Sequence, residues 1–260
     1  MSSKAYLKIV KSLNKKKQRN KHSLFLVEGI RGCEELIKSE FKVDHIFYSA
    51  PGLSNPRIKG LIDILEAKKI NSKEISPEEM NDIADAVTTQ NIIAVAKLPS
   101  DSLNINLSKM SRVLCLESIS DPGNLGAIVR TASWFGVDAV VLSNGSVDVY
   151  NPKVVRSSSG GIFTVPIFSN VTLNDLLQEA KAANFQIIAT IPHGGQSLHK
   201  TKFAEKSLLI FGSEADGISA PIISAADTLL SIPSKGTAES LNLAISCGII
   251  LGVMDYNSQV

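Results

Sequence analysis

The chain has 260 residues but only three cysteines, and none of them lies in a Cys-x-x-Cys pair. Cys33, Cys115 and Cys247 are far apart, and each has apolar neighbours. We therefore expect reduced thiols in the core of a cytoplasmic protein rather than disulfides. The four histidines show no metal-ligand spacing, so we expect no metal site.

Long apolar runs and phosphate-binding motifs are also missing. No run of 18 apolar residues is present, which argues against a membrane span, and the N-terminus lacks the apolar core of a secretory signal. There is no GxxxxGK[ST] motif and no GxGxxG after the first expected strand. A nucleotide-dependent transferase that uses the same glycine loops is therefore disfavoured. At 44% hydrophobic residues, the chain can bury one large core or two smaller ones.

Positive charge is concentrated at the N-terminus. Residues 1–21 hold eight of the 27 Lys and Arg side chains and no acidic residue. One interpretation is a solvated, partly disordered tail; the other is an electrostatic arm for a polyanion such as RNA. The second interpretation predicts RNA contacts by Lys15, Lys16, Lys17 and Arg19. The apolar residues between the lysines also fit a short amphipathic helix.

Composition and periodicity divide the rest of the chain into two α/β regions. Residues 23–97 follow the arm (1–22) and alternate short apolar runs with helical patterns such as 30–38, which indicates a compact α/β domain. In this domain Ser76, Pro77 and Glu79 form an expected capping box. A polar segment with no obvious core face, 98–110, reads as a linker.

Residues 111–260 form a longer series in which Val/Ile/Leu-rich strands alternate with helices. The expected strands are 113–117, 139–142, 163–168, 186–190, 207–212 and 228–233, and the expected helices are 125–135, 172–182, 221–225 and 241–254. This alternation is typical of a parallel sheet with helices on both faces. Ligands bind beyond the carboxyl ends of the strands of such sheets, where three polar loops fall.

The first two loops offer different chemistry. In the first, Asn124 is an expected cap of the helix that carries Arg130, and a single arginine in an apolar helix suits phosphate recognition. In the second, glycines frame Glu214 and Asp216. Glycine lets the backbone approach a ligand closely. Two acidic groups would repel a triphosphate and tolerate a neutral or cationic ligand.

The third loop brings polar residues to the mouth of an almost wholly apolar helix. Ser240 is an expected cap of that helix, and Asn242 is expected to be buried and therefore hydrogen-bonded. Folding alone would favour an apolar residue at position 242. The loop is thus a place where a ligand and a packed core meet.

Four segments together resemble a known family: NLGAIVRTASWFG, NPKVVRSSSGG, LLIFGSEADG and IPSKGTAESLNLAIS. In this order and at these separations they resemble the SpoU (TrmH) family of RNA ribose 2′-O-methyltransferases of the SPOUT class, over residues 111–256. The earlier segments FLVEGIRGCEELI and TTQNIIAVA resemble the substrate-binding domain that precedes the catalytic domain in many members.

This resemblance implies S-adenosylmethionine as methyl donor, RNA as substrate, a homodimer and a C-terminal trefoil knot. The expected fold is a small N-terminal α/β RNA-binding domain followed by a SPOUT domain at 111–260. We expect rRNA to be the substrate. A tRNA substrate remains an alternative, as does a non-catalytic RNA-binding protein that has kept the fold.

The resemblance also implies roles for individual residues. Arg130 matches the catalytic arginine, and the polar residues that shape the site are Asn124, Glu214, Ser240 and Asn242. The backbone positions expected to hold the cofactor are Gly212, Gly217, Ile232, Gly236 and Leu241. Arg156 and Ser157 match a segment where RNA contact is plausible. Two positions depart from the family pattern, because Ser234 stands where Met is usual and Asn91 where Gly is common.

Overall fold

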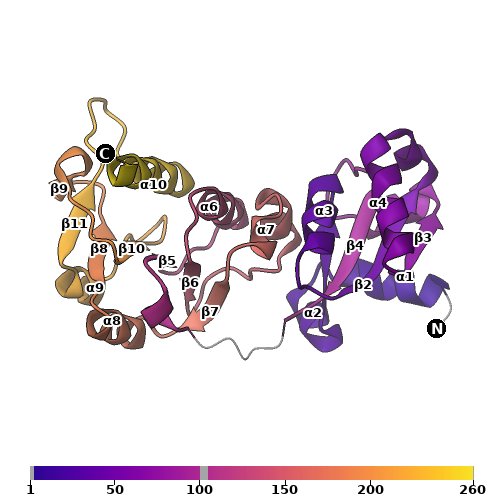
Figure 1. Ribbon diagram of the computed structural model, residues 1–260, viewed down its shortest axis with the longest axis horizontal. Coiled ribbons are helices and arrows are strands. Elements are labelled where there is room, and N and C mark those ends of the chain that lie inside the picture. The colour runs from indigo at the N-terminus through magenta and orange to yellow at the C-terminus, as the bar shows by residue number, and fades with distance from the viewer. Residues whose placement is uncertain (1–2, 100–104, 260) are drawn as a thin grey trace. The chain divides into compact units, whose positions relative to one another are not determined.

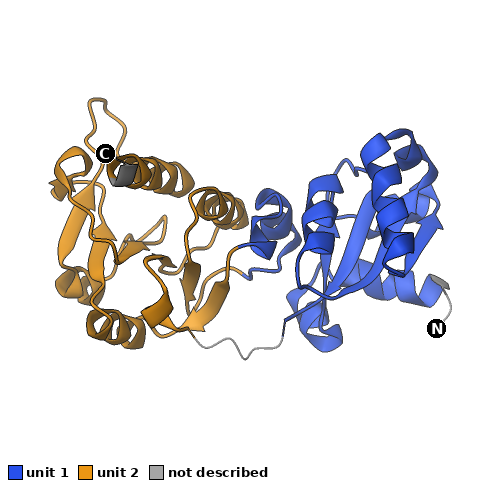
Figure 2. Cartoon of the chain, in the orientation of Figure 1, with its two compact units in different colours: residues 1–101, 148–164 blue, residues 102–147, 165–260 orange. Residues whose placement is uncertain are grey.

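The computed structural model describes residues 3–99 and 105–259. The chain forms two compact units, one from residues 1–101 with 148–164 and the other from residues 102–147 with 165–260 (Figure 2). Residues 148–164 therefore pack with the first unit, although they lie between strands of the second. The boundaries expected from the sequence, 23–97 and 111–260, remain a prediction for the folding domains.

The first unit is a mixed four-stranded sheet with helices packed on it (Figure 1). Strand order is β1-β4-β2-β3, in which β4 runs antiparallel to β1 and β2 while β3 pairs parallel with β2. The strands are β1 (Leu24–Glu28), β2 (Val43–Ser49), β3 (Ser72–Ile75) and β4 (Ile92–Lys97). The elements packed on or between them are α3 (Ile30–Lys38), η1 (Ala50–Ser54), α4 (Pro56–Ala67) and α5 (Pro77–Ile83).

Local sequence signals account for several of these elements. Helix α3 has the predicted bounds, and the predicted capping box is present at α5, with the side chains of Ser76 and Glu79 bonding each other's backbone N–H groups. Asn91 has φ of +62°. A position where glycine is common thus needs the left-handed conformation, which Asn tolerates better than most residues.

The basic N-terminal segment is folded. It forms α1 (Ser3–Ser12) and α2 (Lys16–His22), and Leu7, Val10 and Leu13 are buried against the core of the first unit. The amphipathic-helix prediction is confirmed, and the interpretation as a partly disordered tail is wrong for these residues. The apolar side chains recur at helical spacing, so one face of the helix can pack on the core. Burial of that face offsets the conformational entropy that the segment loses when it folds.

The second unit contains a seven-stranded sheet in which every pair of strands is parallel, as predicted. Strand order is β7-β6-β5-β10-β8-β11-β9, with α8 and α9 over one face and α6 and α10 on the other (Figure 1). The strands are β5 (Arg112–Leu116), β6 (Ala139–Ser143), β7 (Ile167–Val171), β8 (Gln186–Thr190), β9 (Gln196–Ser197), β10 (Ser207–Phe211) and β11 (Thr228–Ser231). The helices are η2 (Leu107–Lys109), α6 (Pro122–Trp134), α8 (Leu173–Ala182), η4 (Leu198–Lys200), α9 (Ala220–Ala225) and α10 (Leu243–Gln259).

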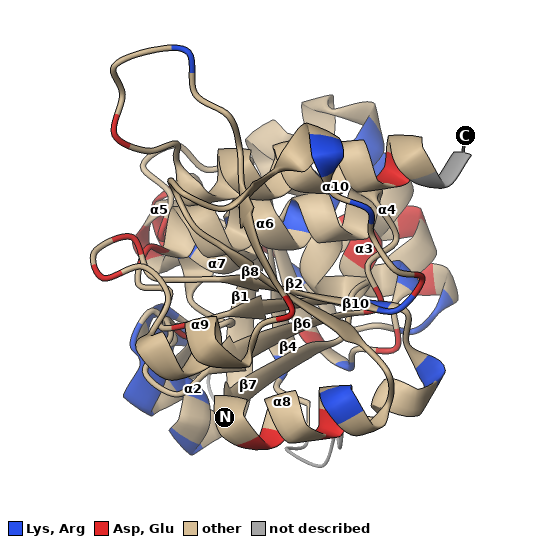
Figure 3. Cartoon of the chain, turned by 90° about the vertical axis from the view of Figure 1, so that its left-hand side faces the viewer, with Lys and Arg blue, Asp and Glu red and all other residues tan. Residues whose placement is uncertain are grey.

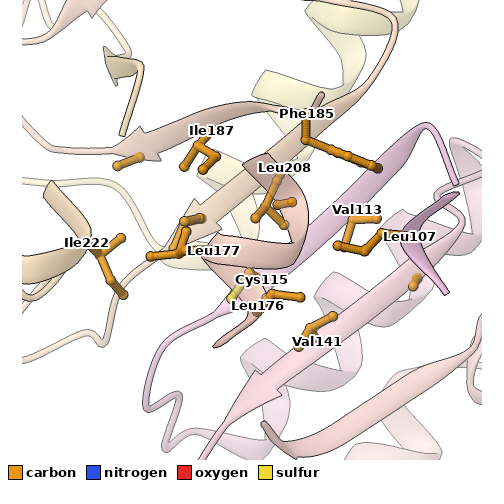
Figure 4. Packing of buried hydrophobic residues seen from close by; sticks show 14 of the residues in the cluster. Leu107, Val113, Cys115, Val141, Leu176, Leu177, Phe185, Ile187, Leu208 and Ile222 are labelled. Atoms are coloured by element: carbon orange, nitrogen blue, oxygen red, sulfur yellow. The ribbon is translucent and has the colours of Figure 1, made fainter. Parts of the chain in front are cut away.

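The core under α8 and α9 is built from alternate residues of the central strands. Val113, Val141, Ile187 and Leu208 point from the sheet toward Leu176, and Figure 4 shows this packing. Leu107 of η2 is buried in the same cluster. The expected linker therefore does have a core contact at its end, while residues 100–104 of that linker lie outside the described residues.

Two predicted elements differ from the structure. The polar stretch NPKVVRSSSGG forms α7 (Pro152–Ser157), which begins at a cap where the Asn151 side chain accepts from the backbone of Lys153. The strand expected at 163–168 is replaced by η3 (Gly161–Phe163) followed by β7. Pro166 has no N–H to give to a ladder, and the Phe163 ring packs against Phe41 in the first unit instead. The trefoil knot remains a prediction.

Candidate active site

The candidate site lies in the second unit, where β5 and β10 end side by side. Leu116 and Phe211 are paired in register, and the N–H of Glu117 donates to the carbonyl of Phe211 at 2.8 Å. The segments that follow these strands carry Asn124 and Glu214, and the start of α10 carries Asn242. The carboxyl edge of a parallel sheet is where open α/β folds bind their ligands.

A chain of hydrogen bonds joins these three predicted residues. The Asn242 side-chain N–H donates to Asn124 Oδ1 at 2.9 Å, and the Asn124 Nδ2 donates to Glu214 Oε1 at 2.8 Å. Ser120 Oγ lies 3.5 Å from the other carboxylate oxygen, Glu214 Oε2. Glu214 is exposed and accepts at the end of this chain, so its carboxylate keeps acceptor capacity for a ligand.

Helix capping leaves Asn124 available for this network. Asp121 is the cap of α6, with its Oδ1 accepting from the Asn124 N–H at 2.7 Å, so the prediction that Asn124 caps this helix is wrong. The Pro122 ring fixes φ for the first helical position. The Asn124 side chain is therefore free of capping and spans the gap between Asn242 and Glu214.

Asn242, not Ser240, caps the last helix. Its Oδ1 accepts from the N–H groups of Ala244 and Ile245 at 2.9 and 3.3 Å. Both predictions for this loop are thus wrong in detail, because Ser240 is not the cap and Asn242 is exposed rather than buried. The cap uses the Asn242 oxygen, and its amide N–H remains for Asn124. The Asn242 side chain thus caps α10 with its oxygen and bonds Asn124 with its amide N–H, which explains why a polar residue stands at position 242.

Arg130 stands apart from the hydrogen-bonded chain. It is exposed on α6, and its guanidinium has no ion-pair or hydrogen-bond partner among the described residues. Trp134, one helical turn further on the same face, is 84% exposed. An arginine that folding leaves unpaired is available to an anionic ligand.

The glycine loop after β10 is closed by its own backbone. Ser213 and Gly217 exchange two backbone hydrogen bonds, at 3.0 and 3.1 Å, and Gly217 has φ of +68°. A Cβ on Gly212 would lie 2.1 Å from the backbone carbon of Gly217. Gly212 is therefore required by the close approach of the loop to itself, which is how Glu214 is held at the edge of the sheet.

The loop before α10 is open. Residues 233–242 are all exposed, and the contacts holding them include His193 Nε2 with the Glu239 carbonyl at 3.0 Å and Ser234 Oγ with Gly236. Ile232 is half-buried, Leu241 is 47% exposed, and nothing lies near a Cβ built on Gly236. Backbone groups are therefore exposed in this loop, and the glycine loop after β10 adds the exposed carboxylates of Glu214 and Asp216.

Two of the predicted RNA contacts have protein partners in the first unit. Arg156 Nη1 lies 3.2 Å from Asp85 Oδ2 and 3.6 Å from Glu28 Oε2, and Ser157 follows it at the end of α7. Arg19 is 2% exposed and donates to Asp148 and to the carbonyls of Leu13 and Asn14. The prediction that Arg19 contacts RNA is therefore wrong, because its guanidinium is buried and fully engaged. Lys15, Lys16 and Lys17 are exposed.

The cysteine side chains lie in the core of the protein. All three cysteines are free and buried, and burial raises the pKa of Cys33 and Cys247 to about 12, so these thiols stay protonated. Within residues 3–99 and 105–259, no three His, Cys, Asp or Glu side chains group as metal ligands. No helix of this part of the chain is long and apolar enough to cross a membrane.

Sequence reasoning missed Ser120 and Asp121 as parts of the site. Both lie between the end of β5 and α6, and Asp121 stands directly before a proline, a common start for a helix. The signal for Asp121 was therefore present. Ser120 becomes visible only once β5 and β10 are known to be neighbours.

The fold and this edge of polar residues define a two-unit α/β protein with a candidate ligand site on a parallel sheet, and comparison with known proteins gives its family. Residues 111–252 match the model of the SpoU rRNA methylase family, and residues 4–94 match that of the MRM3-like substrate-binding domain. The chain belongs to the SpoU rRNA methylase family, whose members are RNA 2′-O-methyltransferases. The second match includes most of the basic segment in the substrate-binding domain.

Relatives cover nearly the whole chain. It is 32% identical to the 23S rRNA (guanosine(2553)-2′-O)-methyltransferase RlmP of Bacillus subtilis, over 93% of this chain and 92% of that protein. A crystal structure of an RNA 2′-O ribose methyltransferase superposes with a TM-score of 0.89 at 26% identity and covers 100% and 98% of the two chains. The methyltransferase AviRb of Streptomyces viridochromogenes in complex with AdoMet has the same fold, with a TM-score of 0.83 at 24% identity over 98% of each chain.

Proposed function

We propose that the protein transfers a methyl group from S-adenosylmethionine to the 2′-hydroxyl of one nucleotide in structured rRNA. The observation that carries this proposal is the hydrogen-bonded chain Asn242–Asn124–Glu214 at the carboxyl edge of the parallel sheet. These are three of the polar residues that the family resemblance implies. A non-catalytic relative would have had no reason to keep all three, together with Arg130 on the same helix as Asn124.

The cofactor is expected at the two loops beyond β10 and β11. Backbone groups near Gly212, Gly217, Ile232, Gly236 and Leu241 would hold it, while Glu214 offers negative charge to the sulfonium. S-adenosylmethionine supplies an activated methyl group. The protein's task is then to place the ribose oxygen in line with that methyl and to assist loss of the hydroxyl proton.

Arg130 is the candidate for the second task. A guanidinium stays protonated at neutral pH and cannot serve as a free base. It can bind the phosphate next to the target ribose and stabilise developing charge on the 2′-oxygen, with the phosphate accepting the proton. Ser240 lies in the exposed loop on the way to Asn242 and would line the same pocket.

The site is completed by a second copy of the chain. Ile245, Ile249 and Tyr256 form an apolar stripe on α10 and are 55%, 37% and 69% exposed, and Trp134 is exposed on the neighbouring α6. Helices α6 and α10 are in contact through glycines of α10. A Cβ built on Gly248 would lie 3.9 Å from the Thr131 side chain, and one built on Gly252 would lie 3.7 Å from the Phe135 ring. An unpartnered apolar face of this kind marks a protein interface. A homodimer through it would bring a partner subunit's face to Arg130.

RNA binding is assigned to the first unit. Lys15, Lys16 and Lys17 are exposed on and before α2. Arg156 and Ser157 would contact RNA if a phosphate displaced Asp85 and Glu28 from the Arg156 guanidinium. We propose a cytoplasmic location, which an rRNA substrate and three free, buried cysteines support.

Mapping of 2′-O-methyl groups tests the function. Total RNA from cells with and without the gene should differ at one rRNA nucleotide, and the purified protein with labelled S-adenosylmethionine should restore the methyl on RNA from the deletion strain. A single 2′-deoxy substitution at that nucleotide should abolish transfer. Methyl restored only in tRNA, or attached to a base, would contradict the proposal.

A further inference from the structure

Lysines from three separate chain segments meet at one end of the sheet of the first unit. Lys97 ends β4, and its N–H donates to the carbonyl of Lys42, which precedes β2, at 2.9 Å. The N–H of Leu98 donates to the carbonyl of Ser23 at 2.9 Å, and Ser23 joins α2 to β1. Because β4 runs antiparallel to β1 and β2, its end lies beside their beginnings. Lys42 and Lys97 therefore join the lysines of α2.

The outer face of α2 adds Lys17 and Lys21. These residues are four positions apart and so lie on one helix face, about half a turn from Arg19. Arg19 is buried and tied to Asp148, which fixes the helix with that face outward. Lys17, Lys21, Lys42 and Lys97 are all exposed, and no hydrogen-bond or ion-pair partner holds their side chains among the described residues. Figure 3 shows the blue of Lys and Arg along α2. We call these four residues the lysine end.

Among the described residues, few acidic groups lie near the lysine end, and two of these groups are engaged. Asp148 is paired with Arg19, and Asp44 accepts a hydrogen bond from the Tyr6 hydroxyl. Burial, together with Asp44, raises the pKa of Tyr6, so that its hydroxyl keeps the proton that it donates. Glu40 is the exposed acid closest along the chain to Lys42. The lysine end therefore carries a net positive charge suited to a polyanion.

Aromatic side chains are not available there for stacking on bases. Every aromatic residue described in the first unit is buried or half-buried. Phe41, next to Lys42, packs against Phe25 and Phe163, and Tyr6 packs against Phe47. Proteins that hold single-stranded RNA rely on exposed aromatic rings for stacking, whereas helical RNA is bound through its phosphates and shape.

We propose that the lysine end docks the phosphate backbone of a helical segment of the substrate RNA, independently of its base sequence. This inference rests on the proposed function and adds to it a surface and a class of RNA structure. Two of its four lysines, Lys42 and Lys97, lie outside the basic N-terminal segment. Docking there would hold the rRNA while a separate, unpaired nucleotide enters the site on the second unit.

The test compares two variants of the full-length protein. One replaces all four lysines of the lysine end with glutamine; the control, K59Q/K69Q, removes two exposed lysines of the same unit. Binding to an RNA hairpin of about 20 base pairs and arbitrary sequence, and to oligouridine of equal length, is measured across a salt series. We expect the wild type to bind the hairpin more tightly than oligouridine. For the hairpin, the slope of log binding constant against log salt concentration should be smaller in magnitude by about four in the fourfold variant than in the wild type.

Methyl transfer separates docking from catalysis. With the rRNA that the wild type methylates, the KM for RNA should rise at least about tenfold in the fourfold variant, with kcat kept at saturating RNA, while K59Q/K69Q behaves as wild type. Equal salt slopes in the fourfold variant and the control would overturn the inference, as would tighter binding of oligouridine than of the hairpin. If the wild type methylates no rRNA at all, the proposed function fails instead, and the hairpin measurement still decides the docking surface.

Discussion

Asn242 donates to Asn124 across 118 positions of sequence, at 2.9 Å, and this bond joins the start of the last helix to the first turn of α6. Asn124 in turn donates to Glu214, so three loops that follow different strands are held in one arrangement. The site can therefore exist only when the segments around all three residues are folded. Its integrity depends on amide side chains that act as donor and acceptor at once.

Asn124→Asp should remove that donor and place a second carboxylate beside Glu214. Like charges at hydrogen-bond distance, and a lost bond to a charged acceptor, each disfavour the arrangement by about 1 to 3 kcal/mol. We expect S-adenosylmethionine binding, measured by calorimetry, and methyl transfer to fall at least about tenfold. Asn144→Asp, at an exposed loop position after β6, is the control and should leave both unchanged. Normal binding and transfer in Asn124→Asp would show that the network is dispensable.

Arg130→Lys should abolish most turnover without affecting folding. Lysine keeps the charge and loses the planar fork, so we expect transfer to fall at least about a hundredfold if a phosphate is held by two parallel bonds. Because Arg130 is exposed, thermal unfolding and cofactor binding should match the wild type. Arg31→Lys, on the exposed side of α3, provides a matched change with no expected effect. Near-normal turnover in Arg130→Lys would disprove the assigned role.

Ile245→Lys should convert the dimer to a monomer. A charge at the N-terminal end of the apolar stripe on α10 would be buried without a partner in the dimer, which costs several kcal/mol. Light scattering on the purified protein measures the mass. Ile64 is exposed to a similar degree, 44% against 55%, but lies on α4 of the first unit, so Ile64→Lys should remain dimeric. A monomeric wild type would refute the interface.

Arg19→Gln should destabilise the first unit by about 3 kcal/mol. The substitution leaves the carboxylate of Asp148 and the carbonyls of Leu13 and Asn14 without their shared donor in a buried place. Urea unfolding gives the change in free energy of unfolding. Lys21→Gln, on the exposed side of the same helix, should change it by less than about 0.5 kcal/mol. Similar values for the two variants would mean that the buried ion pair contributes little.

Gly212→Ala and Gly60→Ala should act in opposite directions. The methyl group at position 212 has no room beside Gly217 and should lower the free energy of unfolding by at least about 3 kcal/mol, unless the loop opens and releases Glu214. Position 60 lies inside α4 with nothing within 4 Å of the new Cβ, so alanine should stabilise by about 0.5 to 1 kcal/mol. Thermal unfolding and cofactor binding distinguish a lost fold from an opened loop.

Periodicity and turn signals predicted the parallel sheet, helix α3 and the capping box, because each depends on residues close in sequence. They failed at α7, where a short helix is stabilised by partners far away: the Arg156 guanidinium bonds Asp85, and the ring of Tyr150 packs on Phe25. A run of small and polar residues gives no sign of such partners.

The sequence named the residues of the hydrogen-bonded chain but did not predict how they bond to one another. Asn124, Glu214 and Asn242 were named, while the assignment of caps to Asn124 and Ser240 was wrong. Each of the two loops offers two possible helix caps that are close in sequence: Asp121 and Asn124 in one, Ser240 and Asn242 in the other. The sequence alone does not decide which residue of each pair is the cap. Arg19 was misplaced for the same reason, since a run of basic residues hides which one turns inward.

The return of residues 148–164 to the first unit limits how the protein can be divided. A fragment that begins at residue 111 would keep α7 but lose β1, which packs against α7, and the Phe25 ring, which packs on Tyr150 just before α7. Swapping the N-terminal half for that of a relative would likewise leave Asp148 and Arg156 facing a foreign surface. Substitutions in residues 148–164 must therefore be matched by substitutions in the part of the N-terminal half that they contact. A chimaera between relatives should take residues 148–164 and the N-terminal half from the same protein.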